Sequence, residues 1–425
     1  MAINGFAAIT IEGWRQFKAV NIELHPRLTV LTGANGAGKS TILSVFSQHF
    51  GWHRPLLATP VPTRDGVLSY FIGLFSRQHR SMMHGQDRYR IGSIRYANGN
   101  TGAIYVPGNS GIEYGLQIDG QQHVEGVNIP SHRPVSRFQQ VASIPTSAIS
   151  PSDAYSSYFS EIMNRFHGGH SGFSPAYRMK EALISMAAFG EGNRYLDGRP
   201  DLIVAYTGFI EILQKVLPPS LGFETLAIRP PDVVMVTKTG QFLIDAASGG
   251  LAALIDLTWQ IYMFTVRVKD PVVVMDEPEN HLHPAMQRTL MSRLVDAFPG
   301  VQFIVATHSP FIISSERDSN VYALRYEVTQ VTEEFFEPAF APANSVVATK
   351  LDLQDRASSA NDILREVLGL ETTLPVWVEE RIQQLADRVA GSELTAESYR
   401  AVSDELRSLG LGSAIPRVIE GGLRE

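Results

Sequence analysis

The sequence contains no cysteine, which excludes disulfide bonds and thiolate metal sites. It also has no apolar run long enough to span a bilayer, because the most apolar stretch, residues 251–266, is too short and includes Asp256 and Gln260. The amino terminus lacks a basic region followed by an apolar run, so no signal peptide is expected. Together these absences predict a cytoplasmic protein that does not enter a membrane.

The chain also has little excess charge of either sign. Its formal net charge is −7 over 425 residues, which argues against a uniformly basic coat for nucleic acid but leaves room for a local basic groove. Hydrophobic residues make up 44% of the sequence, enough for a full core. The length allows two or three domains, or one domain with large insertions.

A glycine-rich segment near the start matches a phosphate-binding loop. Residues 33–40 fit the pattern G-x-x-x-x-G-K-S, after an apolar run typical of a buried strand and before a segment with helical spacing. In such a loop backbone N–H groups bind phosphate oxygens, the lysine reaches the β- and γ-phosphates, and the serine hydroxyl holds Mg²⁺. The predicted ATP-binding residues are Asn35, Gly36, Gly38, Lys39, Ser40 and Thr41, with Lys39 also catalytic and Ser40 also a metal ligand.

Two acidic residues end an apolar segment far downstream. Residues 271–277 read PVVVMDE, typical of a strand buried on both faces whose acids emerge where parallel sheets bind ligands. We expect Asp276 to help hold Mg²⁺ and Glu277 to act as general base on the attacking water. His308 follows the next apolar segment and is expected to sense the γ-phosphate. In isolation it reads as a histidine satisfied by nearby backbone.

Ser248, Gly249 and Gly250 precede the long apolar segment. A hydroxyl and free N–H groups at the start of a helix make a second anion site. Without other motifs, the same three residues are typical of a linker or a helix cap.

The order of patterns along the chain predicts an α/β protein. Residues 89–129 are expected to form antiparallel strands, residues 152–217 are helical, and alternating strand and helix patterns then imply a parallel sheet. Three amphipathic helices are expected from residue 358 onward. The predicted divisions are residues 1–151 and 218–355 for the two parts of an ATPase domain, 152–217 for a helical lobe, and 356–425 for a C-terminal helical module.

Together the motifs resemble the ABC-type ATPases of the SMC/RecF/OLD group. The opening TIEGWRQFKAVNIELHPRLTVLTGANGAGKST resembles the start of RecF-like proteins, DEPENHLHPAMQ resembles the extended Walker B motif and D-loop, and VATHSPFIIS resembles the switch-histidine strand. The resemblance implies a P-loop NTPase fold of ABC-ATPase type, with an antiparallel β subdomain and a helical lobe between Walker A and signature. It also implies a homodimer or higher homo-oligomer in which ATP joins the loop of one subunit to the signature serine of another.

By that resemblance residues 248–250 take the signature role, although the family more often shows LSSGE or LSGGQ where this chain has AASGGLA. The Q-loop glutamine of the family corresponds to Gln139 or Gln140, and Gln140 is taken as the metal ligand. The segment SHRP at 131–134 resembles a motif of defence-associated ATPases, which would bring Arg133 to the nucleotide. A surface arginine after a turn is the alternative.

Features of other branches of the group are missing. Residues 152–217 lack sustained heptads and contain glycine-rich breaks, so a compact lobe is expected instead of a long coiled coil. The sequence shows no D-x-D pair of a Toprim nuclease after His308 and no H-N-H constellation, and His281 and His283 are explained as D-loop residues.

The C-terminal segment resembles the tail of Septu-type defence ATPases, which implies a docking module for a separate nuclease or toxin-like effector. Simple packing faces are the alternative.

Two functions follow from the resemblance. The first is an ATP-hydrolysing subunit that acts as a nucleotide-gated sensor and regulator of a separate effector in bacterial anti-phage defence. The second is a RecF-like DNA-binding ATPase of repair and recombination, for which the densest basic stretch is the candidate surface and a solvated loop is the alternative. Its cations are Arg77, Arg80, Arg88 and Arg90, with His79 and His84 beside them. A transporter ATPase fits the N-terminal strands and the D-loop poorly.

Overall fold

The computed structural model describes residues 5–62, 68–73, 87–108, 111–133, 138–143, 146–328, 344–370, 372, 374–390, 400, 403, 404 and 407. The chain divides into two compact units, Met1–Ile363 and Leu364–Glu425. No helix within the described ranges is long and apolar enough to cross a membrane. The functional divisions expected from the sequence, including the module at 356–425, stay a prediction.

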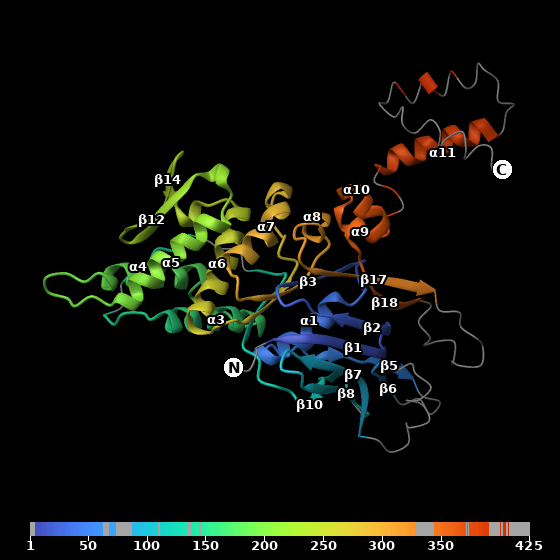
Figure 1. Ribbon diagram of the computed structural model, residues 1–425, viewed down its shortest axis with the longest axis horizontal. Helices are drawn as coiled ribbons and strands as arrows, with labels where there is room; N and C mark the ends of the chain where they lie inside the picture. The colour runs from blue at the N-terminus through green and yellow to red at the C-terminus, as the bar shows by residue number, and fades with distance from the viewer. Residues whose placement is uncertain are drawn as a thin grey trace. The chain divides into compact units, whose positions relative to one another are not determined.

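The centre of the first unit is a parallel sheet built from the apolar segments. Its strands lie in the order β3 (Leu28–Gly33), β16 (Gln302–Ala306), β15 (Val272–Asp276) and β11 (Gly126–Ile129), and each pairing is parallel. Strands β3 and β16 are buried throughout, and β15 is buried up to Asp276, as expected for strands covered on both faces. Helix α1 (Lys39–Ser47) packs against these strands (Figure 1). The carboxyl ends of the core strands therefore meet near the start of α1.

An antiparallel half continues the same sheet and confirms the predicted β subdomain. It contains β1 (Phe6–Trp14), β2 (Phe17–Glu23), β7 (Arg88–Tyr96), β8 (Thr101–Pro107) and β10 (Gln117–Asp119). Between the two halves lie β17 (Asn320–Val328) and β18 (Asn344–Lys350). Two short ladders pair β4 (Leu56–Leu57) with β9 (Glu113–Tyr114) and β5 (Thr59–Pro62) with β6 (Leu68–Phe71).

One strand departs from the expectation of antiparallel pairing over residues 89–129. Strand β11 pairs in parallel with β15, with Val127 opposite Val273. The expectation is wrong here because residues 120–125 carry the chain from the hairpins to the far edge of the parallel core. A side chain at Gly126 would meet the Phe50 ring and the Val272 carbonyl, so glycine permits this close approach. As a result, residues 130–133 leave a core strand beside β15.

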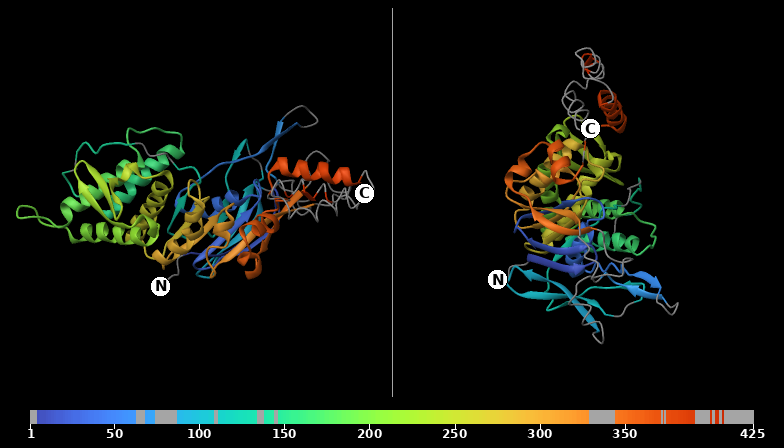
Figure 2. Two further views of the ribbon diagram at one scale, coloured as in Figure 1. Left: turned by 90° about the horizontal axis from the view of Figure 1, so that it is seen from above. Right: turned by 90° about the vertical axis from the view of Figure 1, so that its right-hand side faces the viewer.

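The helical lobe consists of α3 (Pro151–Phe166), α4 (Pro175–Gly190) and α5 (Pro200–Val216). Each helix begins with proline, whose missing N–H needs no partner there, and Ser150 and Ser174 cap the first two. The sheet formed by β12 (Phe223–Arg229), β13 (Asp232–Thr237) and β14 (Gly240–Leu243) packs on α4 and α5 (Figure 2). The longest of these helices has 17 residues, so the described lobe is compact, as predicted.

Helix α6 (Gly249–Arg267) connects the lobe to the core, since it contacts the lobe helices α3 and α5 and also the core strand β11. Its central residues, including Trp259, are fully buried. The remaining short elements are η1 (Gln48–Phe50), η2 (Pro219–Leu221), η3 (Ile244–Ala246), α7 (Pro284–Ala297), α8 (Pro310–Ile313) and α9 (Leu353–Ala357). The strand order and the placement of the loop before α1 are those of a P-loop NTPase of ABC-ATPase type, which confirms the predicted fold class.

The C-terminal region contains α10 (Ala360–Asp362), which continues into η4 (Ile363–Val367), and then α11 (Val376–Ala390). On α11 the apolar side chains of Val378, Ile382 and Leu385 are buried, in agreement with an amphipathic helix. The third helix expected from the sequence falls almost wholly outside the described residues.

Candidate nucleotide-binding site

The phosphate-binding loop lies between β3 and α1. Gly36 and Gly38 have φ values of 78° and 94°, and a side chain at Gly38 would collide with the Phe17 ring. Helix α1 has no side-chain cap at its start, so the N–H groups of its first turn are available to an anion. Asn35, Gly36 and Ser40 are exposed at this end. The local geometry is therefore suited to the phosphate binding that the sequence predicts, and the assignment of the individual residues stays a prediction.

Lys39 is 6% exposed and its ammonium group lies inside the loop. Nζ donates to the carbonyl oxygens of Gly33 at 3.0 Å and Ala34 at 3.1 Å. Burial lowers the pKa of Lys39, and the nearby carboxylates, Asp276 first among them, oppose that shift. The charge of Lys39 is thus held at the base of the loop and is screened little by solvent.

Ser40 and Asp276 converge although they are 236 positions apart. Ser40 Oγ donates to Asp276 Oδ2 at 2.7 Å. Burial raises the pKa of Asp276, the Ser40 hydrogen bond lowers it, and Glu277 raises it further. Two oxygen ligands of the kind that Mg²⁺ prefers therefore stand together at the start of α1.

Glu277 and His308 form a second pair at the same edge. Glu277 Oε1 lies 3.9 Å from His308 Nε2, and Glu277 Oε2 accepts from Asn280 Nδ2 at 3.0 Å. Glu277 has a φ of 48°, an uncommon left-handed conformation for glutamate, and its N–H donates to the carbonyl of Ala306. Burial, with the charge of Lys39, lowers the pKa of His308, while Glu277 raises it. The lowered pKa favours the neutral imidazole, which can donate to a phosphate or accept from one of its waters.

Glu279 is a residue that the sequence analysis missed. Its Oε1 accepts from Thr307 Oγ1 at 2.5 Å and from the N–H of His308 at 3.0 Å. Its carboxylate is buried, and burial raises its pKa, with the Thr307 hydrogen bond opposing. It joins the D-loop to the strand end that carries His308. The second glutamate of the run DEPE was the available signal.

Arg133 lies just beyond β11, next to the end of β15. Its Nη2 donates to the carbonyl oxygens of Pro278 at 3.2 Å and Asn280 at 3.1 Å. Burial lowers the pKa of Arg133, and the charges of Asp256 and Glu279 oppose this. Arg133 therefore holds the segment after Glu277 in place and is not a free surface arginine.

The two candidate Q-loop glutamines lie elsewhere. Gln139 is bound in the helical lobe, where Nε2 donates to the carbonyl of Gly172 at 2.6 Å and Oε1 accepts from the N–H of Ser174 at 3.1 Å. Gln140 is exposed, and no hydrogen bond among the described residues joins it to Asp276. Its role as metal ligand stays a prediction. At the end of β11 the side chains present are instead those of Ser131 and His132, which bond to each other at 3.1 Å.

The signature segment is exposed and lies beside the D-loop. Ser248 precedes α6 as its N-cap, yet its side chain caps no N–H, and both Ser248 and Gly249 are exposed. A side chain at Gly250 would stand 2.9 Å from the carbonyl oxygen of His281. Nothing in this chain's described residues joins Ser248 to the phosphate loop. The two anion sites of one chain are therefore separate.

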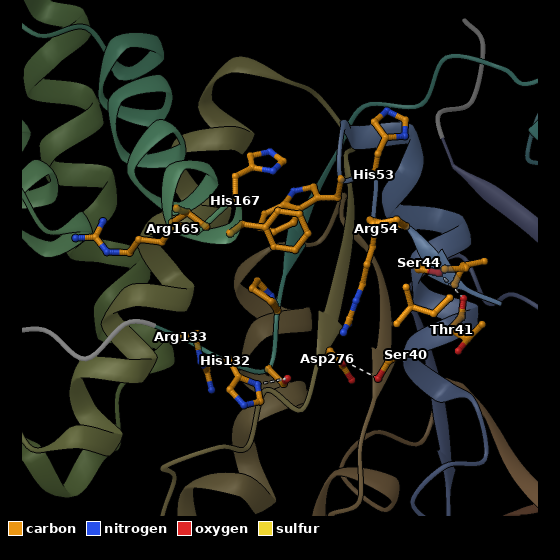
Figure 3. A pocket seen from close by; sticks show the side chains of 18 of the residues that line it. Ser40, Thr41, Ser44, His53, Arg54, His132, Arg133, Arg165, His167 and Asp276 are labelled. Carbon is orange, nitrogen blue, oxygen red and sulfur yellow. Dashed lines mark hydrogen bonds between the residues drawn. The ribbon is translucent and has the colours of Figure 1, made fainter. Parts of the chain in front are cut away.

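A cavity of about 1240 Å³ adjoins the Ser40 and Asp276 pair (Figure 3). Arg54 extends into it toward both residues.

The cations proposed as a DNA-binding surface give little support to the RecF-like alternative. Arg88 pairs with Asp119 and Arg90 donates to the carbonyl of Gly92, while Arg77, Arg80, His79 and His84 lie outside the described residues.

Comparison with known proteins falls on the same motifs. A family model described as "AAA domain, putative AbiEii toxin, Type IV TA system" matches residues 241–314, and a model described as "AAA domain" matches residues 8–55. The chain is 29% identical over 203 residues to the Septu protein PtuA of Bacillus mycoides (strain KBAB4), a match that covers 47% of this chain and 24% of that protein. It is 27% identical to the Retron Vc95 probable ATPase of Vibrio cholerae serotype O1 biovar El Tor, a match that covers 33% of this chain and 29% of that protein. It is 28% identical to the Retron Ec83 probable ATPase of Escherichia coli, a match that covers 24% of this chain and 21% of that protein.

The chain thus spans less than a third of the length of these three relatives. Solved structures that it resembles include the SMC head domain from Thermotoga maritima, with 13% identity, 82% of this chain and 99% of that chain covered, and a TM-score of 0.38. An Smc head domain from Pyrococcus furiosus gives 13% identity, 85% and 99% coverage, and a TM-score of 0.42. The segments matched by the two family models, residues 8–55 and 241–314, contain the phosphate loop, the signature, the acidic strand end and His308. The sequence matches confirm the resemblance to defence-associated ATPases of the Septu kind.

Proposed function

We propose that this SMC/RecF-like P-loop protein is a subunit that binds and hydrolyses Mg²⁺-ATP. The observation that carries the proposal is the 2.7 Å contact of Ser40 with Asp276, beside the pair of Glu277 and His308. Two distant parts of the chain thereby supply a phosphate cradle, two oxygen ligands and a general base at one edge of the sheet. The relatives named as probable ATPases support the same activity.

We infer a role for each group. The N–H groups of α1 and the ammonium of Lys39 bind the phosphates. Ser40 and Asp276 fit Mg²⁺, which when bound would neutralise charge on the β- and γ-phosphates. Glu277 takes a proton from water, and Asn280 fixes the orientation of its carboxylate through Oε2. His308, held by Glu279 through its backbone, contacts the γ-phosphate side.

The exposed signature segment supports an oligomer. Ser248 and Gly249 are exposed and have no internal partner for their hydroxyl and N–H groups within the described chain, and the phosphate loop is likewise exposed at Asn35, Gly36 and Ser40. We infer that ATP on the loop of one copy binds Ser248 of a second copy, so that two copies enclose two nucleotides. Because these contacts exist only in the closed form, ATP shifts the population toward it.

The biological role follows the named relatives. Similarity to a Septu protein and to retron ATPases supports a nucleotide-gated sensor or regulator in bacterial anti-phage defence, in the cytoplasm, working with a separate nuclease or toxin-like effector. The second unit, Leu364–Glu425, is the proposed docking module. A chain that ends at Ile363 should bind ATP but fail to co-purify the effector. Unchanged co-purification would exclude that unit as the docking site.

The Glu277→Gln variant tests the activity. It keeps the size and the hydrogen bond of the side chain but cannot accept a proton, so ATP turnover should fall by roughly 10²–10⁴-fold while ATP binding persists. Glu12→Gln, at an exposed position on β1, is the matched control and should behave as wild type. Normal turnover by Glu277→Gln would remove Glu277 as the base.

A further inference from the structure

The cavity beside the phosphate loop begins at the proposed Mg²⁺ ligands and extends away from the loop. Its lining contains Ser40, Thr41 and Asp276 at one end, and residues 52–57 and the end of α3 at the other. None of residues 33–39, whose N–H groups form the phosphate cradle, lines it. At about 1240 Å³ it is also larger than the range usual for a small-ligand pocket, roughly 300–1,000 Å³. The cavity therefore has room for a ligand other than the triphosphate in the loop.

The charge of the lining favours an anion. Four arginines and three histidines among the described residues face a single carboxylate, that of Asp276, although the whole chain carries a net charge of −7. Some of these cations already have internal acceptors, since Arg15 donates to the Leu57 carbonyl and Arg165 to the Phe173 carbonyl. Arg54 is exposed and extends into the cavity (Figure 3), where its charge acts on Asp276 but no hydrogen bond joins it to another described residue. Arg54 is thus available to a phosphate.

An aromatic pair forms part of the same wall. Trp52 is 3% exposed and lies edge-on to Phe166, with ring centroids 4.7 Å apart, while Phe166 is 38% exposed. The indole N–H of Trp52 is buried and has no acceptor in the described chain. A buried donor without a partner is unfavourable, and an acceptor on a ligand would satisfy it. The partly exposed Phe166 ring beside the exposed guanidinium of Arg54 is a combination that suits a nucleobase with its phosphate.

We propose that this cavity binds a nucleoside phosphate distinct from the ATP of the phosphate loop. Its phosphate pairs with Arg54, and its base lies against Phe166 with an acceptor on the indole N–H of Trp52. The proposal rests on the proposed function, because the neighbouring loop is taken to hold ATP. The ligand is either a free nucleotide or the end of a single nucleic-acid strand, since both present the same group.

Two probes separate these sources. The full chain is titrated, with and without a saturating non-hydrolysable ATP analogue, against a 5′-phosphorylated hexadeoxynucleotide labelled at its 3′ end and against labelled dTMP. Trp52→Phe keeps the ring and removes only the N–H, so it should weaken probe binding about tenfold. Arg54→Gln should weaken it by about the same factor. The matched control is Trp259→Phe, because Trp259 also has a buried N–H without a partner but lies in the core of α6.

Each outcome decides the proposal. Hexanucleotide binding that dTMP displaces identifies a strand end, and binding of dTMP alone identifies a free nucleotide. If neither probe binds, or if Trp52→Phe and Trp259→Phe weaken binding equally, the cavity is not this site. A wild-type chain that binds a probe but not the ATP analogue would refute the proposed ATPase function and leave the cavity site standing.

Discussion

The phosphate end of the parallel sheet and the signature end of α6 are built in opposite ways. At the phosphate end, side chains from distant segments hold one another, as in Ser40 with Asp276 and Glu279 with Thr307. At the signature end, Ser248 and Gly249 are exposed and Ser248 does not cap its own helix. The first region is preorganised within one chain. The second has donors that only a further molecule can use.

Arg133 and Asp256 connect the two regions. Asp256 lies on α6, the helix that Ser248 begins, and it is buried where Tyr158 donates to Oδ1 and Gln260 donates to Oδ2 at 3.0 Å. The charge of Arg133 favours the ionised form of Asp256, while Arg133 itself holds the carbonyls after Glu277. The phosphate end and the signature end are therefore built differently, yet the buried charges of Arg133 and Asp256 connect them.

The largest expected effect is at the phosphate end. Lys39→Ala should weaken ATP binding by at least about a hundredfold, because it removes a buried charge that only a phosphate loop of this kind places there. Binding of a fluorescent ATP analogue measures this. Lys18→Ala, which removes an exposed lysine paired with Glu327, is the control and should bind as wild type. Equal affinities for the two variants would mean that the loop is not the ATP site.

The link between the regions predicts a pH-dependent stability. Burial raises the pKa of Asp256 to about 6 from 3.8. Because the pKa of Asp256 is higher in the folded than in the unfolded chain, this group stabilises the fold fully below about pH 3.8, and that stability is lost as the pH rises through 6. Asparagine does not titrate, so the free energy of unfolding of Asp256→Asn should rise relative to wild type by up to about 3 kcal/mol between pH 4 and pH 7. Urea unfolding of both proteins across this range gives the difference. A difference independent of pH would contradict the assigned burial and charge of Asp256.

A smaller effect is expected from Arg133→Lys. Lysine keeps the charge but cannot span the carbonyls of Pro278 and Asn280 as the guanidinium does, so the segment after Glu277 loosens. Turnover should fall about tenfold while ATP affinity stays nearly unchanged, because the variant loses stabilisation of the transition state and not of bound ATP. Arg199→Lys, in an exposed pair with Asp201, is the control. A loss of affinity equal to the loss of turnover would argue for direct nucleotide binding by Arg133.

The smallest effect separates two candidate metal-site residues. Ser131 lies at the end of β11 and lines the cavity with Asp276, whereas Gln140 is exposed away from any described contact with Asp276. Ser131→Ala should raise the Mg²⁺ concentration for half-maximal turnover about threefold, and Gln140→Ala less than about twofold, if proximity to Asp276 decides ligation. The reverse order would support Gln140 as the metal ligand and argue against Ser131.

The sequence predicted those parts of the site that lie in short patterns attached to strand ends. The phosphate loop, Asp276 and His308 each follow an apolar strand, and parallel strands bring their carboxyl ends to one edge whatever their exact order. Strand order itself is a long-range property. One of the two neighbours of β15 is β11, which looked like part of the hairpins, so Ser131 could not be placed from local pattern. Trp52 and Arg54 belong to no periodic pattern at all.

The central claim is that one chain carries two half-sites that only a second chain completes. Lys39→Ala lacks the phosphate half and Ser248→Arg lacks the signature half, so each variant alone should hydrolyse no ATP. Mixed in equal amounts, they should recover up to about a quarter of wild-type turnover, because half of the random dimers hold one intact site of two. A mixture as inactive as its components would contradict the account.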